Sequence, residues 1–348
     1  PRLFDEWQMY PVVWDCIRTD VDKTGEKGNY ILTGSAKPSE GEIMHTGTGR
    51  ISRIMMRPMS LYESGESNGK VSLKSIFEGK DIEATSELTL EGIAEAIVRG
   101  GWPASLDVEG NAKYRFAQEY IKSLLREEVK SVDGIERNPN KMVAVLRSLA
   151  RNISTPVSNS TIEGDVKNNF DEEISRPTLN DYINTLEKLY VVENINSTNL
   201  NFRSKSALRV KAKKEFIDPS IATAILELSP EDLLKDLNLF GFLFECMCIR
   251  DLKVYSQEIN GDISFYRDEN NFEVDAILRT QSGRWGAIEI KLGAGYIDAA
   301  AKNLLRFKEK VNTEKCGEPA FLMVLTGTTY SYRRDDGVYV VSIGSLKN

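Results

Sequence analysis

The chain has 348 residues, of which 41% are hydrophobic and 28% charged, and its formal net charge is −7. This length is too great for a single core, so two or three domains are expected. No apolar stretch reaches membrane-spanning length and no signal-peptide pattern is present, which predicts a cytoplasmic protein with no membrane partner. The single histidine excludes His-rich metal sites. The negative net charge argues against nonspecific coating of nucleic acid, so any such contact should be local.

The N-terminal segment predicts a strand, a helix and a second strand. The first strand ends in Asp5-Glu6, and the second runs through residues 30–32 into Thr33-Gly34-Ser35. Acid pairs are common, so Asp5-Glu6 alone is a weak signal. Arg50 lies in a Gly-rich turn after the second strand. A surface arginine that closes this turn is the favoured interpretation of Arg50.

Helices dominate the prediction for residues 62–190. Helical spacing is seen at 71–77, 89–99 and 112–130, and then at 142–152, 161–170 and 174–190. Ser175 is a candidate N-cap, with Pro177 in the first turn. Strands at 191–195 and 207–210 follow the last helix. Three helices and a β-hairpin predict a winged helix-turn-helix at 131–215.

A basic stretch without acids falls where the wing of that domain would lie. Its candidate DNA-binding residues are Arg203, Lys205, Arg209, Lys211 and Lys213. Alternating cations on one strand face suit phosphate contacts. A solvated sheet edge protected by charge is the alternative, and it is slightly favoured.

Residues 237–252 predict a helix that is apolar on nearly all sides and therefore buried. Glu245 lies in its middle, where a carboxylate needs a cation. Arg250 or Arg267 would supply that cation in a structural ion pair. A metal ion would supply it in a functional site.

Two predicted strands after this helix carry further charges. Residues 272–278 deliver Asp275, and residues 287–292 carry Glu289 and Lys291 on one face. Two carboxylates and an ammonium group at neighbouring strands suit a hard divalent cation and a water that it activates. A structural salt bridge satisfies the same charges, and spacing alone leaves both interpretations open.

The predicted order from residue 237 onward is αβββαβ. Short strands are predicted at 254–257 and 263–267, a helix at 296–311, and strands at 320–325 and 338–343. With these residues and this order, the C-terminal part resembles the PD-(D/E)xK nuclease-like superfamily. The resemblance implies that Glu245, Asp275 and Glu289 bind Mg²⁺ or Mn²⁺ and that Asp275, Glu289 and Lys291 are catalytic. Many members of that superfamily have lost catalysis and only bind, so a complete set of these residues does not establish activity.

A second resemblance covers nearly the whole chain. Its motifs recur in one order: Asp5-Glu6-Trp7-Gln8, Leu32-Thr33-Gly34-Ser35, Gly49-Arg50-Ile51, Pro58-Met59-Ser60-Leu61, Gly100-Gly101-Trp102-Pro103, Gly241-Phe242-Leu243-Phe244-Glu245 and Glu273-Val274-Asp275. They resemble prokaryotic AAA+-type ATPases that carry a C-terminal nuclease-like domain of unknown function. The resemblance implies that Asp5, Glu6, Ser35 and Arg50 face ATP and its Mg²⁺.

The chain departs from that family because it has no phosphate-binding loop of the form Gly-x₄-Gly-Lys-Ser/Thr. It also begins with Pro1, inside the expected Walker B strand. We therefore expect a fragment that does not bind ATP well, whereas the intact parent does.

Together these observations predict an α/β multidomain chain with a truncated AAA+ core, a helical lid, a winged helix-turn-helix and a C-terminal αβββαβ nuclease-like domain. The expected boundaries are 1–61, 62–130, 131–215 and 216–348. The predicted function is ATP-dependent nucleic-acid processing, with DNA as partner, a metal-dependent DNA endonuclease domain and oligomerisation through the AAA+ part. The alternatives are an inactive nuclease-like module on an ATPase switch that docks a protein partner, and a winged-helix DNA-binding regulator.

Overall fold

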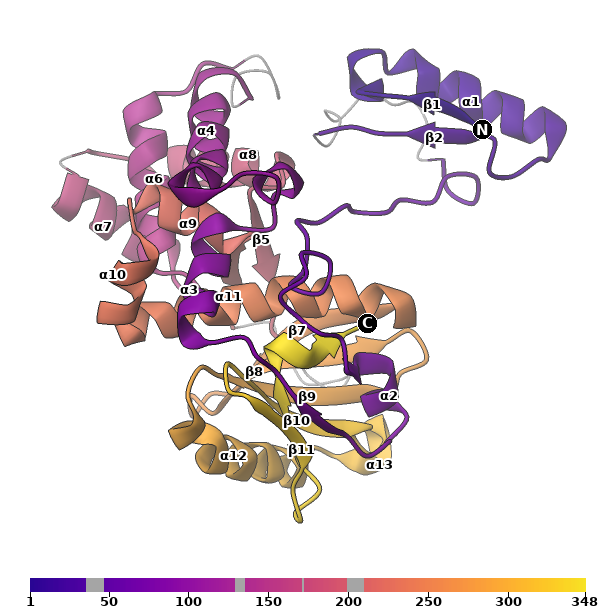
Figure 1. Ribbon diagram of the computed structural model, residues 1–348. Helices are drawn as coiled ribbons and strands as arrows, with labels where there is room; N and C mark the ends of the chain where they lie inside the picture. The colour runs from indigo at the N-terminus through magenta and orange to yellow at the C-terminus, as the bar shows by residue number, and fades with distance from the viewer. Residues whose placement is uncertain (36–46, 129–134, 171, 199–209) are drawn as a thin grey trace.

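The computed structural model describes residues 1–35, 47–128, 135–170, 172–198 and 210–348. At the N-terminus, strands β1 (Arg2–Phe4) and β2 (Tyr30–Leu32) pair in parallel, and helix α1 (Val12–Thr24) connects them. This is the predicted strand–helix–strand order. Figure 1 shows the unit standing apart from the other elements, with an extended segment leading away from it.

The middle of the chain is mainly helical. Its helices are α3 (Leu90–Arg99), α4 (Arg115–Ser123), α6 (Pro139–Arg151), α7 (Asn159–Phe170), α8 (Arg176–Lys188), α9 (Pro219–Ile225) and α10 (Pro230–Lys235). Thr89, Asn138 and Ser175 cap three of them by accepting backbone N–H bonds.

An antiparallel strand pair follows α8. It consists of β5 (Val192–Ile195) and β6 (Lys213–Phe216). The elements expected for a winged helix-turn-helix are therefore present, although β6 begins after the predicted 207–210, of which 207–209 lie outside the described residues. The winged-helix classification itself stays a prediction.

The C-terminal part is built on a seven-stranded mixed sheet with the order β4-β11-β12-β10-β9-β8-β7. Its elements are β4 (Glu83–Thr85), helix α11 (Leu237–Tyr255), β7 (Gly261–Arg267), β8 (Glu273–Thr280), β9 (Trp285–Lys291), helix α12 (Ile297–Lys310), β10 (Phe321–Thr326), β11 (Tyr330–Arg333) and β12 (Tyr339–Ser342). From α11 to β10 the main elements follow the predicted αβββαβ order, with a short helix, α13 (Thr313–Cys316), between α12 and β10. Strand β11 was not predicted.

Helices α11 and α12 cover opposite faces of this sheet (Figure 1). Because strand residues alternate between faces, Ala276 and Ile288 belong to the core that includes α11, whereas Ile277 and Ala287 belong to the core under α12. Strands β8 and β9 are therefore buried on both sides. Charged side chains on them must find partners inside the protein.

The structure corrects two sequence predictions. Residues 254–257 were expected to form a strand, but α11 continues to Tyr255, because its apolar surface packs along its whole length. Residues 62–88 were expected in a helical lid, and helix α2 (Leu73–Phe77) does form within the predicted 71–77. The segments beside it differ from the prediction, since β3 (Val71–Ser72) pairs with β13 (Leu346–Lys347) and β4 joins the sheet beside β11. Such pairing between distant segments leaves no local periodic signal.

None of the helices in the described ranges is long and apolar enough to cross a membrane. Helix α11 is the longest apolar one, and it is buried inside the C-terminal domain.

Candidate functional site: a buried cluster of acids and lysines

Strands β8 and β9 bring Asp275, Glu289 and Lys291 together. The Lys291 Nζ lies 2.7 Å from Asp275 Oδ2 and 2.7 Å from Glu289 Oε2. The backbone N–H of Ile290 donates to Asp275 at 2.7 Å, and Asn303 on α12 donates to Glu289 Oε1 at 2.6 Å. The predicted trio is therefore assembled, and Lys291 bridges the two carboxylates.

Glu245, in the middle of α11, meets a lysine from a different part of the chain. The Lys213 Nζ lies 2.7 Å from Glu245 Oε1 and 2.7 Å from Glu273 Oε1. The Lys213 side chain is only 3% exposed. Neither arginine proposed as a structural partner reaches Glu245, since Arg250 pairs with Asp218 and Asp251, and Arg267 pairs with Glu273.

The ion pairs of Lys213 and those of Lys291 influence one another electrostatically. Burial raises the pKa of Glu245 and that of Glu289, and the negative charge of Asp275 raises both further. Burial also opposes ionisation of Asp275, but Lys291 and Lys213 hold its pKa below the ordinary value. Asp275 acts on the pKa of Glu245 and on that of Glu289, so it lies near each of them. The cluster therefore joins Glu245 on α11 to the strand residues.

A fourth buried acid, Glu215, extends the cluster along β6. Burial and the charge of Glu245 raise the pKa of Glu215 to about 8. The Ser154 hydroxyl donates to Glu215 Oε2 at 3.2 Å, whereas Glu215 Oε1 is buried without a hydrogen-bond partner. Glu215 is neutral over part of the physiological pH range, because a buried carboxyl favours its uncharged form.

The donor types suit Mg²⁺ or Mn²⁺, which prefer carboxylate oxygen. The arrangement does not, because ammonium groups occupy the positions between the carboxylates. Across the parts of the chain that the structure describes, no group of three or more His, Cys, Asp or Glu side chains is arranged to hold a metal ion. The cluster as it stands is an ion-pair network.

Sequence reasoning missed four members of this cluster: Lys213, Glu215, Glu273 and Asn303. Two of them had a readable signal. Lys213 and Glu215 share a strand face and have opposite charges, which is typical of a buried pair rather than of a basic DNA-binding edge. Nothing local in the sequence links that strand to Glu245.

The prediction that Lys213 contacts DNA needs correction, because its ammonium group is buried against carboxylates. Lys211 is exposed. The predicted contacts at Arg203, Lys205 and Arg209 lie outside the described residues.

The predicted nucleotide-facing residues of the N-terminal unit are exposed at one end of β1 and β2. Asp5 accepts a hydrogen bond from Thr33, and Ser35 Oγ donates to Glu6 Oε2 at 3.0 Å. Glu6 has a left-handed backbone with φ 49°, a strained conformation that occurs more often at functional sites than elsewhere. Arg50 instead pairs with Asp22 on α1 at 2.6 Å.

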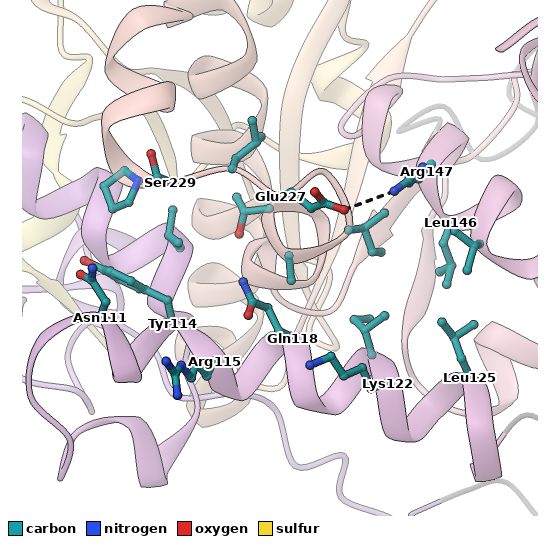
Figure 2. A pocket seen from close by; sticks show the side chains of 18 of the residues that line it. Asn111, Tyr114, Arg115, Gln118, Lys122, Leu125, Leu146, Arg147, Glu227 and Ser229 are labelled. Carbon is teal, nitrogen blue, oxygen red and sulfur yellow. Dashed lines mark hydrogen bonds and ion pairs between the residues drawn. The ribbon is translucent and has the colours of Figure 1, made fainter. Parts of the chain in front are cut away.

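A separate groove lies among the helices of the middle region (Figure 2). Its cavity measures about 730 Å³, and α4, α6, α9 and the turn after α9 surround it. Arg115, Gln118 and Lys122 line one wall, and Arg147 pairs with Glu227 at 3.4 Å on another. The groove contains no member of the acid–lysine cluster.

Comparison with known families identifies three segments. Residues 2–65 match a family described as an AAA domain. Residues 90–232 and 240–346 match two domains of unknown function, DUF8612 and DUF4143. The middle match spans the boundary that we predicted at 130/131. No curated protein and no solved structure matches the chain. The predicted likeness to AAA-type ATPases is confirmed at this level, and the chain is similar to an AAA-type ATPase-associated family with a C-terminal domain of unknown function.

Proposed function

We propose that the chain is part of an ATP-dependent protein in which the AAA-like unit acts as a switch for a C-terminal domain that docks a protein partner. The observation that carries this proposal is the closure of the acid cluster by Lys213 and Lys291. A hydrolase would need those carboxylates free to bind its metal and water. An ion-pair network needs only to hold its elements together.

An extended segment after the AAA-like unit supports the switch. Arg57 makes a two-pronged contact with Glu193 at 2.9 and 3.0 Å, and Lys253 on α11 pairs with the same carboxylate at 2.7 Å. The backbone N–H of Leu61 donates to Asp251, also on α11, at 3.0 Å. A displacement of the AAA-like unit would therefore pull directly on α11, the helix that carries Glu245.

The second candidate function is metal-dependent phosphodiester hydrolysis. It is favoured by the contacts of Lys291 with Asp275 and Glu289, and by the place of Glu245 on the preceding helix, in the expected element order. In that case the three carboxylates would hold Mg²⁺ or Mn²⁺, which would polarise a phosphate and activate water. Lys291 would position the water or stabilise the charge that develops on the phosphate in the transition state. DNA would be the substrate.

Calorimetric titration with MnCl₂, together with a DNA-cleavage assay, separates the two candidates. Wild type and Asp275→Ala are compared. The docking proposal expects no saturable binding that depends on Asp275 and no cleavage in either sample. Metal-dependent cleavage that disappears in Asp275→Ala would overturn it in favour of the nuclease.

Residues 1–348 contain no phosphate-binding loop, so the ATP dependence is tested in a protein that carries such a loop together with this chain. We expect ATP to change the protease sensitivity of the segment 52–62 in that protein. A segment whose cleavage rate is the same with and without ATP would contradict the switch.

A further inference from the structure

The groove of Figure 2 lies entirely within the middle matched segment, residues 90–232. Its cavity of about 730 Å³ falls in the size range of ligand-binding sites. One wall follows α4 and the turn after it, from Arg115 to Leu125, which is about 15 Å along the helix axis. A second helix has room for about three turns along this wall.

The floor of the groove is apolar and only partly covered. Ile121 and Leu125 come from the α4 wall, Val143 from α6 and Leu228 from the turn after α9. All four side chains are half-buried, so they keep apolar surface in contact with water. Apolar side chains of a ligand that cover this surface would gain free energy of binding.

The α4 wall carries positive charge that the fold does not use. Arg115 is exposed and makes no ion pair with any residue in the parts of the chain that the structure describes. Lys122 pairs at 2.7 Å with Glu119, one turn away on the same helix, and both side chains of this pair are exposed. An exposed pair of this kind contributes little to stability, so Lys122 is available to a ligand.

The other side of the groove neutralises this charge only in part. Glu227 lies across from α4 (Figure 2), but it pairs with Arg147 on α6 at 3.4 Å. Glu231, at the start of α10, is the other acid among the described residues that line the groove. The lining therefore has three cations and two acids, in a chain whose net charge is −7. Local positive charge on an acidic protein favours an anionic ligand.

We propose that this groove binds an amphipathic helix of a partner protein, with acidic side chains of that helix against Arg115 and Lys122. An apolar floor beside a charged wall matches a helix whose apolar face is flanked by charged residues. A small anion would satisfy the two cations and leave most of the apolar floor uncovered. The inference goes beyond the proposed function, because it assigns a ligand to the middle segment and not to the C-terminal domain.

Fluorescence anisotropy with labelled helical peptides tests the inference on the wild-type chain. The first probe has about 14 residues, with Leu along one face, Glu along one flank and a hydrocarbon staple on the outer face. The staple keeps it helical, because a free helix of this length is marginal in water. A second probe has Lys in place of each Glu, and a third has Ser in place of each Leu. We expect saturable binding of the Glu probe and about tenfold or more weaker binding of the other two.

The double variant Arg115→Glu/Lys122→Glu reverses the charge of the α4 wall at two exposed positions. We expect it to bind the Glu probe about tenfold or more weakly than the wild type does, and to prefer the Lys probe. The matched control is Lys167→Glu/Lys235→Glu, which makes the same change of charge at two exposed lysines outside the groove. It should bind the Glu probe as the wild type does.

Equal affinity of the wild type for the Glu and Lys probes would overturn the inference, because the α4 cations would then contribute nothing. The absence of saturable binding of the Glu probe would overturn it, and so would equal affinity of the two double variants for that probe. Sedimentation analysis covers a different occupant. A wild-type dimer that is lost in Arg115→Glu/Lys122→Glu would assign the groove to a second copy of the chain. The proposed function fails on different measurements, those of Mn²⁺ binding and DNA cleavage, so the two failures are distinguishable.

Discussion

Two buried ion clusters hold the C-terminal half together, and they differ in how fully their charges are satisfied. In the first, Arg250 pairs with Asp218 at 2.9 Å and with Asp251 at 2.7 Å. The oxygens of these two carboxylates also accept backbone N–H groups from Leu61, Gly101 and Ser220. The second, around Lys213 and Lys291, has excess carboxylates and a buried oxygen without a partner. A buried cluster in which every charged atom has a hydrogen-bond partner stabilises the fold. A cluster with unpaired carboxylate oxygens can also bind a proton or a ligand.

The largest effect is expected from Arg250→Met. Removal of this guanidinium leaves two buried carboxylates unpaired, which costs about 3–5 kcal/mol in the free energy of unfolding. Urea denaturation measures it. The matched control is Arg267→Met at the edge of the second cluster, for which we expect about 1 kcal/mol or less. Equal losses in the two variants would contradict the distinction between the clusters.

The next largest effect is expected from Glu215, whose ionisation makes the free energy of unfolding depend on pH. Burial raises its pKa from 4.5 to about 8, so the folded state binds the proton more tightly than the unfolded state. Its stabilising contribution is complete below pH 4.5 and is lost as pH rises towards 8, at up to about 1.4 kcal/mol per pH unit. Glu215→Gln keeps the shape and removes the Glu215 share of the slope, to which Glu245 and Glu289 also contribute because burial raises their pKa values.

Urea denaturation at several pH values between 5 and 8 checks the Glu215 prediction. Glu91→Gln, an exposed position on α3, controls for the loss of one negative charge. We expect Glu91→Gln to keep the slope of wild type. A Glu215→Gln slope equal to that of wild type would show that Glu215 is ionised in the folded protein.

A smaller effect is expected at Asn303, which supports the second cluster from α12. Its Nδ2 donates to Glu289 and to the carbonyl oxygen of Glu273. Asn303→Ala removes both hydrogen bonds and should cost about 1–3 kcal/mol. It should also raise the pKa of Glu289 further, because the amide stabilises the charged form. Lys302→Ala, the exposed neighbour, should change stability little, and a similar loss there would point to a general effect on α12.

The sequence predicted local elements of the C-terminal domain better than it predicted their partners. The charge pattern at Asp275, Glu289 and Lys291 was visible because strand periodicity places charges among apolar residues. The partners Lys213 and Asn303 come from distant elements, and their pairing depends on tertiary packing. Residue spacing could not show whether a metal ion or a lysine ammonium group neutralises the carboxylates of this cluster.

The Gly100-Gly101 motif shows the same limit. The sequence indicated only a turn. In the structure, a Cβ at Gly101 would lie 2.3 Å from the Met59 carbonyl oxygen, so only glycine lets the segment from the AAA-like unit approach. The backbone N–H of Gly101 also donates to Asp218 of the first cluster. This motif therefore belongs to a contact between distant segments, which local sequence cannot specify.

The smallest effect is expected where an ion pair is open to solvent, at the groove of Figure 2. The side chains of Arg147 and Glu227 are 41% and 79% exposed and 3.4 Å apart. Water already solvates both charges, so Arg147→Ala should change the free energy of unfolding by no more than about 0.5 kcal/mol. Urea denaturation in low and high salt checks this, since a pair of this kind is also screened. A loss comparable to that of Arg250→Met would mean that exposure does not separate structural charges from solvated ones in this protein. The distinction between the two buried clusters would then need a basis other than hydrogen-bond satisfaction.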